Sequence, residues 1–326
     1  MAIEPELVER FRTDLRAISP EDGQEKIGIA FSGGPDSLAL LLLAHAALPG
    51  RVEAASVDHG LRAESAGEAA QAAAVCEALG IPHAILKVEV AKGNLQSEAR
   101  QARYAALAEW AATRGIGAVC SAHHADDQAE TFLMRANRGS GLAGLSGVRA
   151  RTNVPGSDRL LLRPLLGWRR KTLEEIVADS GFQAVQDPSN LDDRFDRVRM
   201  RKALKESDFI DLPSIGRSAQ MLAEMQASID AMAREEYARA LEEDGAPARY
   251  RPFARSQATR PAFLAEVITL LAEAHGAALS RSDAARVVSE LSQNRPINIG
   301  GLQARATQGG GEPEWLFAPE NPRRSG

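Results

Sequence analysis

Short apolar runs alternate with longer helical stretches along the N-terminal part of the chain. Four runs have the length and composition of buried strands, KIGIAFS (26–32), RVEAASVD (51–58), HAILKVEV (83–90) and GAVCSAHH (117–124). Helical stretches follow the first three, DSLALLLLAHAAL (36–48), SAGEAAQAAAVCEALG (65–80) and SEARQARYAALAEWAATRG (97–115). Strand followed by helix predicts an α/β fold, in which a parallel, twisted sheet carries helices on both faces.

The pattern changes after residue 211. Before that point, the strand-like run RLLLRPLL (159–166) and the helical run RKTLEEIVADSG (170–181) extend the same unit. After it the chain becomes alanine-rich and helical, with short strand-like pieces only near its end. We therefore expect two domains, at 1–211 and 212–326, of which the second is a smaller, mainly helical α+β domain.

Composition favours a globular protein in the cytoplasm. The chain has 326 residues, of which 44% are hydrophobic, and no run long and apolar enough to span a membrane. Its N-terminus has the pattern of an amphipathic helix rather than of a secretory leader. The net charge of -5 argues against affinity for nucleic acid over the whole surface, so basic side chains must be judged by position.

Residues 32–37, SGGPDS, form a polar turn between the first apolar run and the first helix. Gly33 and Gly34 leave backbone N–H groups unobstructed, and the helix N-terminus faces the same point, so the turn suits phosphate oxygens. The Walker spacing GxxxxGK[ST] is absent. Asp36 would repel a polyphosphate unless a divalent cation such as Mg²⁺ lies between them, or unless it serves only as a helix cap.

A second glycine-rich string, GSGLAG at 139–144, fits GxGxxG but follows a predicted helix. The dinucleotide-binding fingerprint has to follow a strand. We therefore expect no Rossmann site there.

Polar residues also follow two other predicted strands. VDHGLR (57–62) presents Asp58 and His59, which can position adenine, ribose or a metal, although a lone histidine is often structural. In HHADDQAE, a helix that begins near residue 126 places Asp127 and Glu130 on one face, three residues apart. Such an acidic pair suits an ammonium group.

Other roles for the HHADDQAE stretch remain open. Its acids can cap the helix or complement its dipole. They can also bind a metal with His123 and His124, but adjacent histidines at a strand end point to opposite faces, which favours substrate recognition over metal.

Basic residues gather in two places on this acidic chain. Between residues 149 and 171 there are seven basic side chains against one acid, and a second cluster between 194 and 205 is diluted by aspartates. Such clusters produce a local positive field that suits RNA, although a charge run is often only a solvated face. For Arg103, on the helix at 97–115, the alternative to a functional role is likewise a solvated surface side chain.

These motifs resemble a known family. SGGPDS resembles the SGGxDS loop of the PP-loop ATP pyrophosphatases, whose fold is of the adenine nucleotide alpha hydrolase type. SAHHADDQAETFLMRANRGSGLAGLSGV, VDHGLR, ARY and DPSNLDDRFDRVRMR resemble the tRNA(Ile)-lysidine synthetases over roughly residues 26–205. Members of that family use ATP to adenylate C2–O of the wobble cytidine, C34, in the CAU anticodon of tRNA(Ile). The side-chain amine of free L-lysine then displaces AMP.

The resemblance implies a role for each matching residue. It assigns to ATP Ser32, Gly33, Gly34, Pro35, Asp36, Ser37, Asp58 and His59. Catalysis is assigned to Asp36, as the Mg²⁺ ligand, and to Arg103. It assigns to the lysine substrate His123, Asp127 and Glu130, and to the tRNA Arg138, Arg163, Arg197 and Arg201. The family pattern has Asn where this chain has Val198, so a polar role is in doubt at that position.

Two other functions stay open at this stage. A tRNA thiolase of the same superfamily would deliver sulfur, but such enzymes call on reactive or cluster-binding cysteines, and Cys76 and Cys120 lie in apolar stretches without a CxxC motif. A non-catalytic nucleotide-binding module would not need the Asp127 and Glu130 pair. The sequence does not indicate the oligomeric state, for which a homodimer is one alternative.

Overall fold

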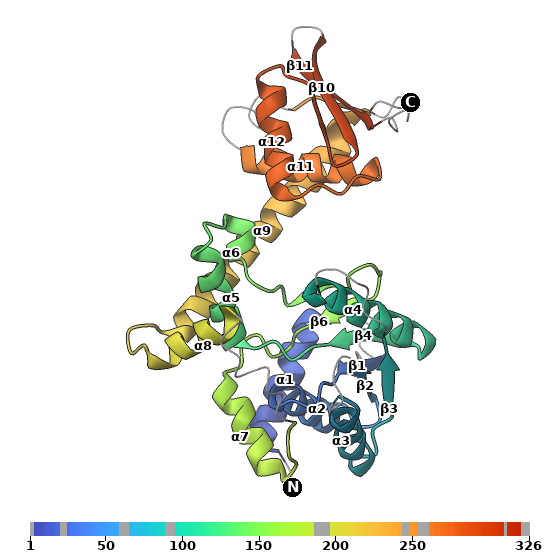
Figure 1. Cartoon of the computed structure of the whole chain (residues 1–326), viewed down its shortest axis with the longest axis vertical. Helices are drawn as coiled ribbons and strands as arrows, with labels where there is room; N and C mark the ends of the chain where they lie inside the picture. Colours follow the sequence, from blue (N-terminus) through green and yellow to red (C-terminus); the bar gives the residue numbers. More distant parts are fainter. Residues whose placement is uncertain are drawn as a thin grey trace. The chain divides into compact units, whose positions relative to one another are not determined.

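The computed structural model describes residues 3–19, 25–58, 65–88, 95–185, 196–242, 248–252, 261–309 and 312–320. The chain divides into two compact units, Met1–Ala223 and Glu224–Gly326 (Figure 1). The division falls within the long helix α9 (Leu212–Ala240). The boundary predicted at 211/212 lies at the start of this helix, whose first turns belong to the N-terminal unit.

A six-stranded sheet with the order β3-β2-β1-β4-β6-β5 forms the centre of the N-terminal unit. Five strands run parallel to one another, namely β1 (Lys26–Ala30), β2 (Val52–Asp58), β3 (His83–Lys87), β4 (Ile116–Cys120) and β6 (Leu160–Leu162). The predicted α/β fold with a mostly parallel sheet is confirmed. The antiparallel edge strand β5 (Arg151–Asn153) was not predicted, because three polar residues give no apolar pattern.

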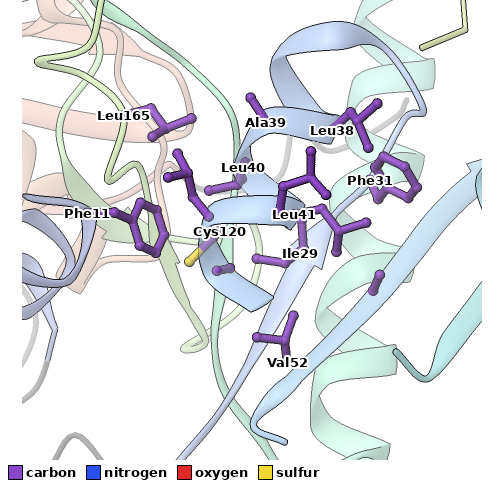
Figure 2. Packing of buried hydrophobic residues seen from close by; sticks show 14 of the residues in the cluster. Phe11, Ile29, Phe31, Leu38, Ala39, Leu40, Leu41, Val52, Cys120 and Leu165 are labelled. Atoms are coloured by element: carbon purple, nitrogen blue, oxygen red, sulfur yellow. The ribbon is translucent and has the colours of Figure 1, made fainter. Parts of the chain in front are cut away.

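Helices cover both faces of this sheet. One face carries α1 (Pro5–Ile18), α2 (Pro35–Ala47), α3 (Ser65–Ala78) and α7 (Arg170–Ser180), and the other carries α4 (Leu95–Thr113). Side chains of β1 alternate between the two cores, since Ile27 and Ile29 pack on the first and Ala30 on the second. Figure 2 shows α2 leucines packed between the sheet and Phe11 of α1. This central position explains why α2 is apolar on every side.

The strand order places the candidate site. It reverses between β1 and β4, and in open α/β sheets ligands bind beyond the carboxyl ends of strands at such a point. The loop after β1 leads into α2, and the loop after β4 leads into α5 (Ala125–Ala136). Two more helices of the unit, α6 (Leu142–Leu145) and α8 (Asp196–Glu206), pack against α5.

The C-terminal unit combines helices with an antiparallel sheet, as the expected α+β domain does. Helices α11 (Pro261–Ala274) and α12 (Arg281–Ser292) pack with the remainder of α9. The sheet has the order β7-β8-β11-β10-β9 and contains β7 (Leu241–Glu242), β8 (Ala248–Tyr250), β9 (Ile297–Ile299), β10 (Leu302–Gly309) and β11 (Glu312–Pro319). In the described parts of the chain, no helix is long and apolar enough to cross a membrane.

The packing of α4 on the sheet can be tested by a substitution at Gly28 of β1. A Cβ atom at Gly28 would lie 2.7 Å from the ring of Trp110, which is buried. We expect Gly28→Ala to lower the free energy of unfolding by about 1–3 kcal/mol through overpacking. Gly67→Ala on α3 is the matched control, because nothing lies within 4 Å of its Cβ position and alanine favours a helix. Urea denaturation of both variants measures the effect, and equal midpoints would contradict it.

Candidate active site

The turn after β1 is fixed by its own hydrogen bonds and by a distant segment. Gly33 has φ +79°, a conformation that favours glycine. Its carbonyl accepts a hydrogen bond from the N–H of Val185 at 2.9 Å, and a Cβ at Gly33 would lie 2.7 Å from that valine side chain. The hydroxyls of Ser32 and Ser37 lie 3.1 Å apart, and Ser37 also donates to the carbonyl of Gly34 at 3.0 Å. These contacts fix the conformation of the loop without a ligand.

Asp36 stands in the first turn of α2, directly after Pro35 at the helix start. Burial alone would raise the pKa of its carboxyl, but His124, Arg170 and Arg201 outweigh burial and lower it. One oxygen, Oδ1, is buried and has no hydrogen-bond partner among the described residues. An ionised carboxylate with an unsatisfied oxygen at a phosphate loop fits a Mg²⁺ ion, which prefers oxygen ligands.

His124 is a central residue that the sequence analysis did not assign. Its ring is fully buried and forms the N-cap of α5, where Nδ1 accepts from the N–H of Asp127 at 3.3 Å. The Asp127 carboxylate accepts from the N–H of His124 at 3.2 Å, which completes a capping box. The interval of three residues between the capping side chain and an acid was the signal in the sequence that could have identified this role.

The imidazole of His124 also faces three carboxylates. Its Nε2 lies 3.6 Å from Asp36, 3.5 Å from Asp127, and its Nδ1 lies 3.9 Å from Asp126. Burial alone would lower its pKa, but these carboxylates outweigh burial and raise it. His124 thereby connects the phosphate loop with the start of α5. No group of three or more His, Cys, Asp or Glu within the described ranges is arranged to hold a metal ion.

Asp127 and Glu130 lie on one face of α5 and are both occupied by arginines of α8. Arg197 contacts Glu130 at 2.9 Å and Asp127 at 3.0 Å, and Arg201 contacts Glu130 at 2.7 and 3.1 Å. Burial would raise the pKa of Glu130, whose side chain is 3% exposed, but Arg201 and Arg197 lower it. The structure thus joins two sets that the sequence analysis kept apart, the residues for lysine and two arginines for tRNA.

His123 contacts Ser121, whose hydroxyl lies 3.1 Å from its Nδ1. Burial is the main reason that the pKa of His123 falls to about 4; the carboxylate of Asp127 opposes this shift, and the cations of Arg163, Arg197 and Arg103 add to it. The ring is therefore neutral at neutral pH. Arg103, on α4, belongs to the same surroundings, and burial lowers the pKa of its guanidinium.

The two remaining arginines assigned to tRNA differ in exposure. Arg163 is buried, and its Nη1 donates to the carbonyl of Arg149 at 2.6 Å and to the hydroxyl of Thr152 at 3.2 Å. This geometry supports strand β5 and does not fit a direct RNA contact. The side chain of Arg138 is 62% exposed and pairs with Asp196 at 2.9 Å.

Of the two residues after β2 that the sequence analysis assigned to ATP, one is described by the structure. Asp58 ends β2, with its carbonyl accepting from Val88 N–H at 3.0 Å, and His59 lies outside the described residues. The GSGLAG segment follows α5, as expected, and not a strand. It packs against that helix, because Arg135 donates to the carbonyl of Gly144 at 2.7 Å.

Comparisons with known proteins agree with this geometry. The PP-loop domain model matches residues 7–207, which implies the use of ATP. The chain is 50% identical to the tRNA(Ile)-lysidine synthase of Novosphingobium aromaticivorans over 223 residues, 68% of either chain. It is 35% identical to that of Methylobacterium sp. over 338 residues, 95% of this chain and 97% of the relative. The chain belongs to the tRNA(Ile)-lysidine synthase family. The sequence resemblance is thereby confirmed.

A solved structure shows how widely the fold of this lysidine synthase family is shared. The U34-tRNA thiolase NcsA from Methanococcus maripaludis, with its [4Fe-4S] cluster, is 18% identical and has a TM-score of 0.54. The alignment covers 67% of this chain and 79% of the thiolase. This likeness shows the common fold alone.

The low pKa of His123 predicts a loss of stability in acid. Between pH 6.5 and about 4 the unfolded chain binds a proton at this residue and the folded chain does not, so stability falls as the pH falls through that window. The effect reaches about 3 kcal/mol at pH 4. We expect His123→Asn, which retains a polar group near Ser121, to lose less stability than the wild type between pH 7 and pH 4. Parallel urea-denaturation profiles of the two proteins would contradict this assignment.

Proposed function

We propose that this chain joins free L-lysine to C2 of the wobble cytidine in the CAU anticodon of tRNA(Ile). ATP first adenylates the C2 oxygen with release of pyrophosphate, and the lysine side-chain amine then displaces AMP. The resulting lysidine changes codon reading from AUG to AUA. The observation that carries this proposal is that His124 lies between Asp36 of the phosphate loop and Asp127, which shares Arg197 with Glu130.

The ATP half of the proposal rests on the loop at residues 32–37. Its preset turn, serine hydroxyls and helix N-terminus suit the phosphates of ATP. Asp36 would hold Mg²⁺, which supplies charge neutralisation for the departing pyrophosphate. The nearby cation of Arg170 lowers the pKa of Asp36 and so helps to keep this ligand ionised. On this basis Asp36 stays our candidate for catalysis, and Arg103 stays a candidate on the family resemblance alone.

The lysine half rests on the acidic pair of α5. Two carboxylates held on a buried helix face provide negative charge for an ammonium group. Because Arg197 and Arg201 satisfy that charge in the structure, the ammonium group has to share or replace their contacts. His123 borders the same place as a neutral ring, so it adds a hydrogen-bonding group without adding repulsive charge.

Two rival functions account for fewer of these features. Cys76 and Cys120 are buried, and burial raises the pKa of both thiols to about 12, so neither is prepared as a thiolate for sulfur transfer. A nucleotide-binding module without catalysis has no use for the acidic pair. Both rivals therefore leave the α5 and α8 cluster unexplained.

Transfer of radiolabelled lysine to a tRNA(Ile) transcript with a CAU anticodon tests the proposal. We expect incorporation that requires ATP, that survives mild alkali and that is absent with methionine tRNA. Survival in alkali distinguishes a bond to the base from an aminoacyl ester. Release of AMP without lysine incorporation would retain the ATP chemistry but overturn lysine as the nucleophile.

Replacing one acid separates lysine binding from ATP binding. We expect Asp127→Asn to raise the KM for lysine at least about tenfold, since a charge-assisted contact is lost, and to leave ATP binding unchanged. Asp179→Asn, at an exposed position on α7, is the matched control and should behave as the wild type. Steady-state kinetics with lysine and ATP varied in turn provide the measurement. An unchanged KM for lysine would remove Asp127 from the lysine site.

The difference in exposure between two arginines predicts different effects on RNA binding. We expect Arg138→Ala to weaken tRNA binding and to reduce the slope of log K against log salt by close to one. Arg163→Ala should leave that slope unchanged and lower thermal stability, because it removes a buried support of β5. Filter binding at several salt concentrations, with thermal denaturation, distinguishes the two. A reduced slope in Arg163→Ala would restore its assignment to tRNA.

A further inference from the structure

A groove between α5 and α8 lies beside the acidic pair, and of its lining residues only Arg138 has a role in the function proposed above. Its volume is about 340 Å³. It is lined by two methionines, an alanine, an asparagine and three charged residues: Met134, Met200, Ala203, Asn137, Arg138, Arg199 and Asp196. A volume of this size falls in the range of small-ligand pockets, so it can take a nucleobase.

The lining separates into an apolar part and a charged part. Methionine side chains are flexible and polarisable, and they pack well against aromatic rings. Arg138 and Arg199 both pair with Asp196, and the three side chains are 62%, 65% and 52% exposed. The two guanidinium groups and the single carboxylate together carry a net charge of +1. A ligand with an aromatic ring and a negative group is complementary to this surface, and a nucleotide has both.

The groove continues the candidate lysine site along the same two helices. Met134 and Asn137 follow Glu130 by four and seven residues on α5, which corresponds to about 6 and 10 Å along the helix axis. On α8, Met200 lies beside Arg201, which contacts Glu130 at 2.7 Å. A nucleotide in the groove is therefore close enough to be the next residue of the same RNA chain after the nucleotide whose base reacts beside the acidic pair.

We propose that this groove binds the adenine that directly follows the reacting cytidine in the CAU anticodon. The inference rests on the proposed function, which provides the anticodon. Asn137 is exposed at the end of α5, and an asparagine amide pairs with N6 and N7 of adenine. Met134 and Met200 contact the face of the base, and the arginines lie toward its phosphate. Unstacked anticodon bases are bound by proteins in this way, by contact with both face and edge.

Equilibrium binding to two tRNAs tests the proposal without requiring lysine transfer. One tRNA(Ile) carries the CAU anticodon, and the other has purine riboside, which lacks the 6-amino group, in place of its adenine. We expect the wild type to bind the second tRNA about tenfold more weakly. Asn137→Ala should bind both tRNAs with a Kd ratio near one. An equal Kd for the two tRNAs in the wild type, or a wild-type ratio in Asn137→Ala, overturns the groove assignment.

A pair of charge variants controls for general loss of RNA affinity. Arg199→Ala and Lys205→Ala each remove one exposed positive charge from α8, but only Arg199 lines the groove. Met200→Ala should lower affinity for tRNA with an intact anticodon more than for tRNA with an abasic site at the adenine, which removes the base but keeps its phosphate. Arg199→Ala, which faces that phosphate, should lower the affinity for both tRNAs by a larger factor than Lys205→Ala does. Lys205→Ala should lower both equally. A failure of lysine transfer with the Kd ratios intact would refute the proposed function alone.

Discussion

Four carboxylates crowd together where α2 and α5 begin, and each needs a positive or donating partner. Asp36 lies in the first turn of α2, and Asp126, Asp127 and Glu130 lie on α5. Buried acids that lose their partners destabilise a protein by several kcal/mol, about 3–5 in measured cases. The fold meets this constraint with a fully buried histidine and with cations from helices that lie far away in the sequence.

This compensation of charge also connects other helices of the N-terminal unit. Asp126 accepts a hydrogen bond from the backbone N–H of Arg170 at 2.9 Å and so caps the start of α7, whose own N-cap residue provides no side-chain bond. Glu130 holds α8 through Arg197 and Arg201. His124 joins α2 to α5. Three helices, α2, α7 and α8, are thus connected to α5 through contacts with this group of carboxylates.

Local patterns were sufficient for the fold and for half of the site. Hydrophobic periodicity gave the parallel sheet, and an interval of three residues placed Asp127 and Glu130 on one helix face, as the structure does. Partners that depend on tertiary contact could not be read in this way, since Arg197 lies 70 residues from Asp127 along the chain. The burial of Arg163 was hidden for the same reason, because its hydrogen-bond acceptors belong to the unpredicted β5 hairpin.

The same compensation supports the proposal that one small volume binds both a polyphosphate and an ammonium group. A set of acids alone would attract lysine but repel ATP, and a set of bases alone would do the reverse. Here each carboxylate lies near a histidine or an arginine, so the net charge of the surroundings is small. Hydrogen bonds hold the individual charged groups in fixed positions. Because His123 is neutral, it adds no further positive charge near the acidic pair beyond that of Arg103 and Arg163. Opposite charges can therefore be received side by side, each by the group that faces it.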